Sequence, residues 1–219
     1  MRRLLVLSVI LFAAAAVLPA ATIQCPTTGT LADLVAMTAR GDVCQSQDKI
    51  FSNFIYTPVV GGTPASDIDV TLVNKAVGAE DIHGWSFVAE TNVTWTLGFT
   101  LSYTISVAPG YPGLAIIQSY DQMNPGAQNT TIKLDDVQTP GVTPSPIELT
   151  GNVQTVYSDF YNLQSVHTVT TATIPEGMDL LTYEQDWFQG STTPEPVSLV
   201  LIGSGLLGLG LLRRRVRRS

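Results

Sequence analysis

Few side chains in this protein are of types that do chemistry. The 219 residues include two histidines and two cysteines. His83 lies in an acidic stretch, residues 80–85, where a metal-binding or general-base role is conceivable, but no second histidine stands at ligand spacing. We therefore interpret His83 as a loop histidine beside acidic residues. His167 lies where apolar and polar residues alternate, so we expect a partly buried or exposed strand residue.

Carboxylates are the other groups with chemical potential. Asp67 and Asp69 form an Asp-x-Asp pattern, and Asp135 and Asp136 are adjacent. Neither pair is followed by the glycine and glutamate of an EF-hand loop. Solvated turn residues are therefore our first interpretation and a loose calcium site the second, and we predict no metal site.

Two pairs of carboxylates, Glu148 with Glu176 and Asp159 with Glu184, could in principle serve as the acid and base of a glycosidase. The spacing along the chain does not bring either pair together. The sequence also lacks a Gly-x-Ser-x-Gly motif and a Walker phosphate-binding loop. We predict that the protein is not an enzyme, has no catalytic residue and needs no cofactor.

Aromatic side chains offer a binding hypothesis. Trp85, Trp95, Trp187, Tyr111 and Tyr120 could stack on sugar rings in a lectin-like groove. Aromatic residues at alternating positions lie more often in the core. Carbohydrate binding is therefore our alternative hypothesis for the function.

The elements that must position these residues are mostly strands. In residues 97–107 six apolar residues alternate with glycine, threonine and serine, which predicts a strand with one buried face. Turn clusters rich in glycine and proline separate the weaker candidates. These are residues 50–57, 68–74, 85–90, 114–120, 131–134, 147–157, 164–173 and 180–187. The pattern predicts an all-β fold, an antiparallel, jelly-roll-like β-sandwich.

A short N-terminal helix is expected ahead of the strands, over residues 30–39. Leu31, Leu34 and Val35 form one apolar face of this segment. Thr30 can cap the start of the helix, and Gly41 can end it.

The N-terminus has the features of a signal peptide. Met1 is followed by Arg2 and Arg3, residues 4–18 carry no charge, and small residues follow up to Ala21. We expect cleavage near residues 20–22, which would leave an exported mature chain.

In an exported chain Cys25 and Cys44 are expected to form a disulfide. The bond would close a loop of about twenty residues and stabilise the fold by roughly 3 kcal/mol. A catalytic thiol is the alternative, but neither cysteine lies in a redox or protease motif.

The C-terminal residues divide into three parts. Pro194, Glu195 and Pro196 come first, and the two prolines hold the backbone extended. The uncharged residues 197–212 would span about 24 Å as a helix, somewhat less than a hydrocarbon core of roughly 30 Å. A basic tail, residues 213–218, follows, and the positive-inside rule places it in the cytoplasm. Its arginines are Arg213, Arg214, Arg215, Arg217 and Arg218.

This order of a Pro-Glu-Pro tripeptide, a short apolar helix and an arginine cluster resembles the PEP-CTERM sorting signal of Gram-negative bacteria. The same tail is also catalogued as an ice-binding protein C-terminal domain. The resemblance implies that Pro194, Glu195 and Pro196 are recognised by exosortase, a membrane transpeptidase. It implies too that residues 197–212 cross the inner membrane and that the five arginines retain the tail in the cytoplasm. More loosely, the cysteine pair and residues 51–54 resemble the start of many PEP-CTERM ectodomains.

The charge is distributed unevenly along the chain. The formal net charge is −7, but between residues 22 and 193 four basic residues stand against seventeen carboxylates, which gives −13. A surface this acidic repels nucleic acid and anionic polysaccharide unless cations intervene. We therefore expect no nucleic-acid partner.

We divide the chain into a signal peptide (residues 1–21), a β-sandwich ectodomain (22–190) and a sorting signal (191–219). We expect an exported, non-catalytic cell-surface or extracellular-matrix protein that is held transiently in the inner membrane. Its expected partners are exosortase and the inner membrane. The resemblance also implies a link to biofilm, with exopolysaccharide as a candidate partner.

Overall fold

The computed structural model describes residues 21–77, 80–89, 94–111, 113–125, 133–139, 147–150, 155–191 and 204. The predicted signal peptide up to residue 20 lies outside the described residues. So does the predicted sorting signal from residue 192 onward, apart from Ser204. Pro194, Glu195, Pro196 and the five tail arginines are therefore not described.

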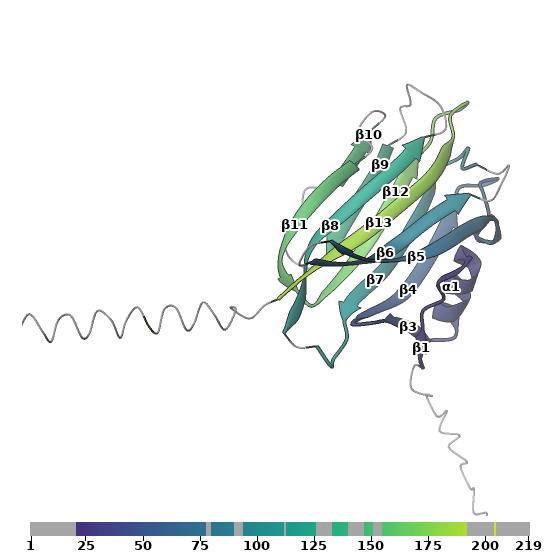
Figure 1. Cartoon of the computed structure of the whole chain (residues 1–219). Coiled ribbons are helices and arrows are strands. Elements are labelled where there is room, and N and C mark those ends of the chain that lie inside the picture. The colour runs from purple at the N-terminus through teal and green to yellow at the C-terminus, as the bar shows by residue number, and fades with distance from the viewer. Residues whose placement is uncertain are drawn as a thin grey trace, which may run out of the picture.

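The described residues form two packed sheets with one short α-helix, which confirms an all-β sandwich (Figure 1). Neighbouring described strands are antiparallel, except that β1 and β3 are parallel. Sheet A has the order β1 (Thr22–Gln24), β3 (Val43–Ser46), β4 (Lys49–Pro58), β7 (Phe99–Val107), β12 (Ser165–Thr173), β9 (Lys133–Thr139) and β10 (Ile147–Thr150). Sheet B has the order β11 (Thr155–Leu163), β8 (Leu114–Pro125), β13 (Leu180–Ser191), β6 (Glu80–Ala89), β5 (Ile68–Val77) and β2 (Thr28–Thr30).

Strand β7 lies in the middle of sheet A and has the predicted alternation. Its apolar residues from Phe99 to Ile105 face the core and are at most 3% exposed, while Thr100, Thr104 and Ser106 lie on the other face. The strand begins at Phe99 rather than at residue 97. Gly98 lies against the backbone carbonyl of Ala172, where a Cβ atom would not fit.

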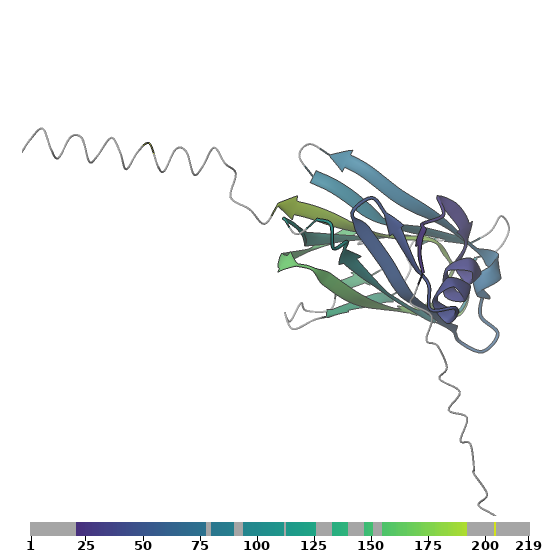
Figure 2. The ribbon, with the colours of Figure 1, turned by 90° about the horizontal axis from the view of Figure 1, so that it is seen from below.

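The helix α1 (Leu31–Ala39) forms where the sequence predicts it. Thr30 is its N-cap, and Asp33 completes a capping box by accepting hydrogen bonds from the backbone and side chain of Thr30. Gly41 follows the helix with φ +78°, a conformation that glycine adopts without strain. The hydroxyl of Thr38 accepts a hydrogen bond from the Phe54 backbone in β4, which ties α1 to the side of the sandwich (Figure 2).

Aromatic side chains fill the space between the sheets. Phe54 of sheet A stacks on Tyr103 with ring centroids 5.1 Å apart, and it meets Trp85 of sheet B edge to face. Trp187 Nε1 donates a hydrogen bond of 3.0 Å to the Tyr103 hydroxyl, which satisfies two polar atoms within the core. The sheets are therefore joined by packed rings, and one hydrogen bond pairs the polar ends of Trp187 and Tyr103.

One sequence prediction about strands is wrong, and three short strands were missed. Residues 147–157 are not one strand, because β10 lies in sheet A and β11 in sheet B, with residues 151–154 outside the described part. The short strands β1, β2 and β3 were not predicted. Each has three or four residues, which is too short for a period of two to stand out.

Candidate functional site

Polar side chains from both sheets meet inside the sandwich where β4 begins and β13 ends. Most are buried: Lys49 is 0% exposed, His83 1%, Asp48 5% and Gln189 7%. Charged side chains are rarely buried to this extent unless they are paired. We call this group the inter-sheet polar cluster. Its members are Ser46, Asp48 and Lys49 from the β3–β4 hairpin and Asn74, His83 and Gln189 from β5, β6 and β13.

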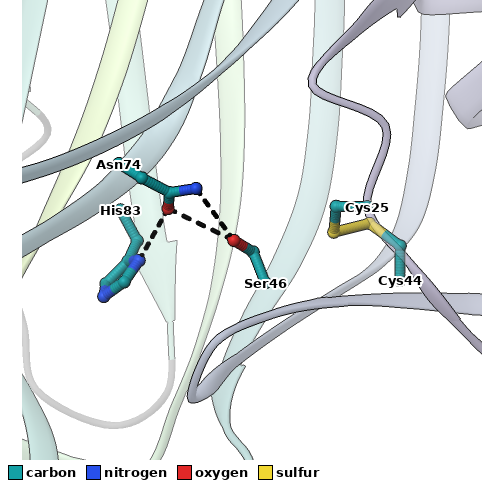
Figure 3. The surroundings of a disulfide bond; sticks show 5 residues. All are labelled: Cys25, Cys44, Ser46, Asn74 and His83. Atoms are coloured by element: carbon teal, nitrogen blue, oxygen red, sulfur yellow. Dashed lines mark hydrogen bonds between the residues drawn. A yellow bond between two sulfur atoms is a disulfide. The ribbon is translucent and has the colours of Figure 1, made fainter.

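Hydrogen bonds and one further polar contact connect the cluster. The Lys49 ammonium donates to Asp48 Oδ2 and to Gln189 Oε1. The other Asp48 oxygen lies 3.3 Å from His83 Nε2, a polar contact rather than a well-aligned hydrogen bond. His83 Nδ1 donates to Asn74 Oδ1 at 2.9 Å, and Asn74 and Ser46 exchange hydrogen bonds of 3.0 and 3.2 Å (Figure 3).

Burial and pairing oppose each other in this cluster. Burial alone would raise the pKa of Asp48, but the contact with His83 Nε2 and the hydrogen bond and charge of Lys49 hold it below its usual value. Burial lowers the pKa of the Lys49 amino group, and Asp48 offsets only part of that effect. Lys49 is therefore easier to deprotonate than a surface lysine.

The cluster contains the residue types of a hydrolase triad without its arrangement. Ser46 Oγ bonds Asn74 and not the imidazole of His83, so His83 is not placed to take the serine proton. Ser46, Asp48 and His83 are all buried, so they do not face an external substrate. What the cluster does hold is a buried amine between a carboxylate and a carboxamide.

The sequence interpretation of His83 is wrong. His83 lies within strand β6, faces Asp48 and Asn74, and is not a loop residue. The roles of Asp48, Lys49 and Gln189 were not predicted. A lysine directly before the strongly apolar Ile50 and Phe51 was the available signal, since a cation at the start of a core strand must find a buried partner.

The predicted disulfide between Cys25 and Cys44 is present. It joins the segment after β1 to β3, and both cysteines are at most 3% exposed. Figure 3 shows it near Ser46 and Asn74 of the inter-sheet polar cluster. The bond therefore fixes the N-terminal segment against the hairpin that carries Asp48 and Lys49.

A second buried polar group lies farther along the same interior. Asp121 Oδ1 accepts hydrogen bonds from Tyr183 at 2.8 Å and from Gln185 at 3.0 Å. Gln185 also donates to the Thr168 hydroxyl of sheet A at 3.1 Å. These contacts again join the two sheets through polar atoms.

A pair of carboxylates lies on β13, where Glu184 and Asp186 are two residues apart and share one face. Lys75 lies 3.2 Å from Glu184 and 4.0 Å from Asp186. Burial, the charge of Glu184 and a hydrogen bond with it raise the pKa of Asp186 to about 8. Gly84 of β6 lies directly against the Asp186 side chain and leaves no room for a Cβ atom.

The carboxylate pairs considered from the sequence do not form a described site. The side chains of Glu148 and Asp159, one member of each pair, lie outside the described part of the structure, as do those of Asp135 and Asp136. Asp67 accepts a hydrogen bond from Ser66, and Asp69 is exposed on β5. Among the residues described here, no group of three or more His, Cys, Asp and Glu is placed to hold a metal ion.

His167 is the partly buried strand residue that the sequence predicts. It lies in β12, and its Nδ1 is 3.1 Å from the Thr104 hydroxyl of β7. This contact joins neighbouring strands on the outer face of sheet A.

The tryptophans are not placed to stack on sugars. Trp85, Trp95 and Trp187 are at most 1% exposed and belong to the core. Tyr120 is half-buried, and Tyr111 is 43% exposed. The three tryptophans therefore do not support a lectin-like groove.

An open groove of about 760 Å³ lies over the ends of β4, β7 and β12. None of the residues that line it is charged. Val60 at its rim is fully exposed, and Val59 and Leu97 are 48% and 36% exposed. Threonines from three neighbouring strands, Thr57, Thr100 and Thr171, add hydroxyl groups to this surface.

Compared with known proteins, the chain matches no protein-family model and no curated protein sequence. Among the residues that the structure describes, no helix is long and apolar enough to span a membrane.

Proposed function

We propose that this protein is an exported, non-catalytic cell-surface or extracellular-matrix protein. Its sorting is directed by exosortase through Pro194, Glu195 and Pro196. The proposal depends mainly on one observation: a β-sandwich with a disulfide lies between an N-terminus that resembles a signal peptide and a tail that resembles a PEP-CTERM signal. By the same resemblance, the protein acts in the exopolysaccharide matrix of a biofilm.

The positions of the folded unit support this proposal. The first described strand begins at Thr22, next to the predicted cleavage site, and the last ends at Ser191, three residues before Pro194. A protease and a transpeptidase could therefore act at the two ends without cutting into a strand.

The disulfide supports export, because such bonds persist in oxidising compartments such as the periplasm. The acidic surface is compatible with a soluble ectodomain outside the cell. Ser46, Asp48 and His83 of the inter-sheet polar cluster are buried away from external substrates, which supports a non-catalytic role.

The sorting proposal is tested by immunoblotting of cell fractions from strains with and without exosortase. We expect a smaller, surface or released form in the first strain and a larger, inner-membrane form in the second. The variant with Pro194, Glu195 and Pro196 replaced by alanine should behave like the protein in the strain without exosortase. An unchanged size and location in all three would reject the proposal.

We also propose that the sandwich is jelly-roll-like. Among the described strands, most successive pairs cross between the sheets; only β3–β4, β5–β6 and β9–β10 stay within one sheet. Such crossing is typical of Greek-key and jelly-roll connections. An experimental structure that traces the connections from 126 to 154 would test it.

Our second candidate function is carbohydrate binding at the groove over β4, β7 and β12. Its uncharged, hydroxyl-bearing lining favours a neutral glycan over an anionic one. A glycan array on the exported protein tests this candidate, with Leu97→Asp as the groove variant and Ile23→Asp as a control at another exposed apolar position. Binding that Leu97→Asp abolishes and Ile23→Asp retains would support it, and no binding would reject it.

A further inference from the structure

The inter-sheet polar cluster brings a primary amine and a carboxamide into contact inside the protein. Lys49 opens β4 of sheet A and Gln189 lies near the end of β13 of sheet B, 140 residues later. The Lys49 Nζ atom contacts Gln189 Oε1. The amide carbon Cδ, which an amine would attack, is bonded to that oxygen.

Burial makes Lys49 a better nucleophile than a surface lysine. Its side chain is 0% exposed, and desolvation favours the neutral amine, which is the form that attacks a carbonyl. The two strands hold the reactants at a fixed position. Such positioning can equal an effective concentration of about 10⁵ M or more.

Asp48 supplies the acid–base group that the reaction needs. Its Oδ2 accepts a hydrogen bond from Lys49 Nζ, and its Oδ1 faces His83 Nε2. His83 is itself held by Asn74, so the Asp48 carboxyl is fixed from both sides. Asp48 is 5% exposed, which keeps water from competing for the proton.

We propose that Lys49 and Gln189 form an intramolecular isopeptide bond that covalently joins sheet A to sheet B. Asp48 takes a proton from the Lys49 ammonium, and the free amine attacks Gln189 Cδ. The new Nζ–Cδ bond forms as the bond from Cδ to Nε2 breaks. Nζ loses two protons in all: one passes through Asp48 to Nε2, which departs as ammonia, and the other remains on the Asp48 carboxyl. No oxidant, cofactor or second enzyme is needed, and the reaction does not depend on sorting by exosortase.

The proposal is tested by mass spectrometry of the full chain purified from a host that exports it, with the disulfide reduced. We expect the intact mass to fall below the sequence mass of the mature chain by one ammonia. Trypsin should not cut after Lys49, because the modified side chain is no longer a substrate. The digest should therefore contain residues 41–75 joined to the peptide that begins at Leu134. Lys75, which is exposed, is the internal control and should be cut normally.

Three variants locate the chemistry. Lys49→Met and Gln189→Met each remove one reactant, and Asp48→Asn keeps both reactants but removes the proton acceptor. Each variant should have the mass calculated from its own sequence, without the loss of one ammonia. Circular dichroism checks that each variant is folded. The wild-type digest decides the proposal even if a variant fails to fold: an unmodified mass with normal cleavage after Lys49 would overturn it.

Discussion

Asp186 shows how one residue gains unusual properties from its surroundings. It is 3% exposed, lies against Gly84 and shares a strand face with Glu184. Burial, together with the nearby Glu184 charge, raises its pKa to about 8, from the ordinary value of 3.8. Lys75 only partly opposes this effect. The folded protein therefore holds a proton on Asp186 that the unfolded chain releases.

This difference predicts a pH-dependent stability. Below about pH 4 Asp186 is protonated in both states, and its contribution to stability is fully present. As the pH rises towards about 8 the unfolded chain binds fewer protons than the folded one, so the free energy of unfolding falls. Asp186→Asn should remove this dependence and stabilise the protein at pH 8 by on the order of 3 kcal/mol.

Urea unfolding of both proteins over this pH range checks the prediction. Asp69→Asn, at an exposed position of β5, is the matched control and should leave the wild-type profile unchanged. If the free energy of unfolding falls equally with rising pH in the wild type and in Asp186→Asn, the raised pKa of Asp186 is not the cause.

The residue scale is also where prediction from sequence was weakest. Cys25 and Cys44 could be paired because only two cysteines are present. The inter-sheet polar cluster could not be predicted, because it joins Lys49 to Gln189 across 140 residues. His83 was misplaced because its acidic neighbours suggested a loop, whereas its strand partners lie on β5 and β13.

At the scale of a single element, helix α1 depends on its N-cap. Its start depends on Thr30, whose hydroxyl accepts a hydrogen bond from the Asp33 backbone and whose own backbone donates to Asp33. Thr30→Ala removes the cap and should lower the free energy of unfolding by about 1 kcal/mol. Thr28→Ala, at an exposed position of β2, is the control and should cost less than half as much. Equal losses in the two variants, measured by urea unfolding, would argue against the cap.

Elements with strong local signals were predictable from the sequence. Strand β7 has an unbroken alternation, and α1 has both a cap and a terminating glycine. The split of residues 147–157 into β10 and β11 could not be predicted, because the local pattern does not say which sheet a strand joins. Sheet membership is set by tertiary contacts instead.

At the scale of the whole molecule, two kinds of link hold the sandwich. The disulfide ties the N-terminal segment to β3, and the proposed isopeptide bond joins β4 to β13. Both lie on the part of the sandwich that carries the inter-sheet polar cluster. Covalent links of this kind suit a protein that works outside the cell, where chaperones do not refold it.

At the scale of the whole chain, the charge distribution supports the export and sorting that we propose. Basic residues gather at the two ends, and the middle carries a formal charge of −13. In our proposal the basic ends belong to segments that engage the membrane, and the acidic middle forms the exported unit. The ends are therefore where processing should occur.

The most direct test of the export and sorting proposal is mass spectrometry of both termini of the mature protein, from native cells with and without exosortase. We predict a new N-terminus near residues 20–22 in both strains. In cells with exosortase the C-terminus should lie at or near Pro194, Glu195 and Pro196, and without it the arginine tail should remain. A mature chain that keeps Met1 and all five tail arginines in both strains would contradict the proposal.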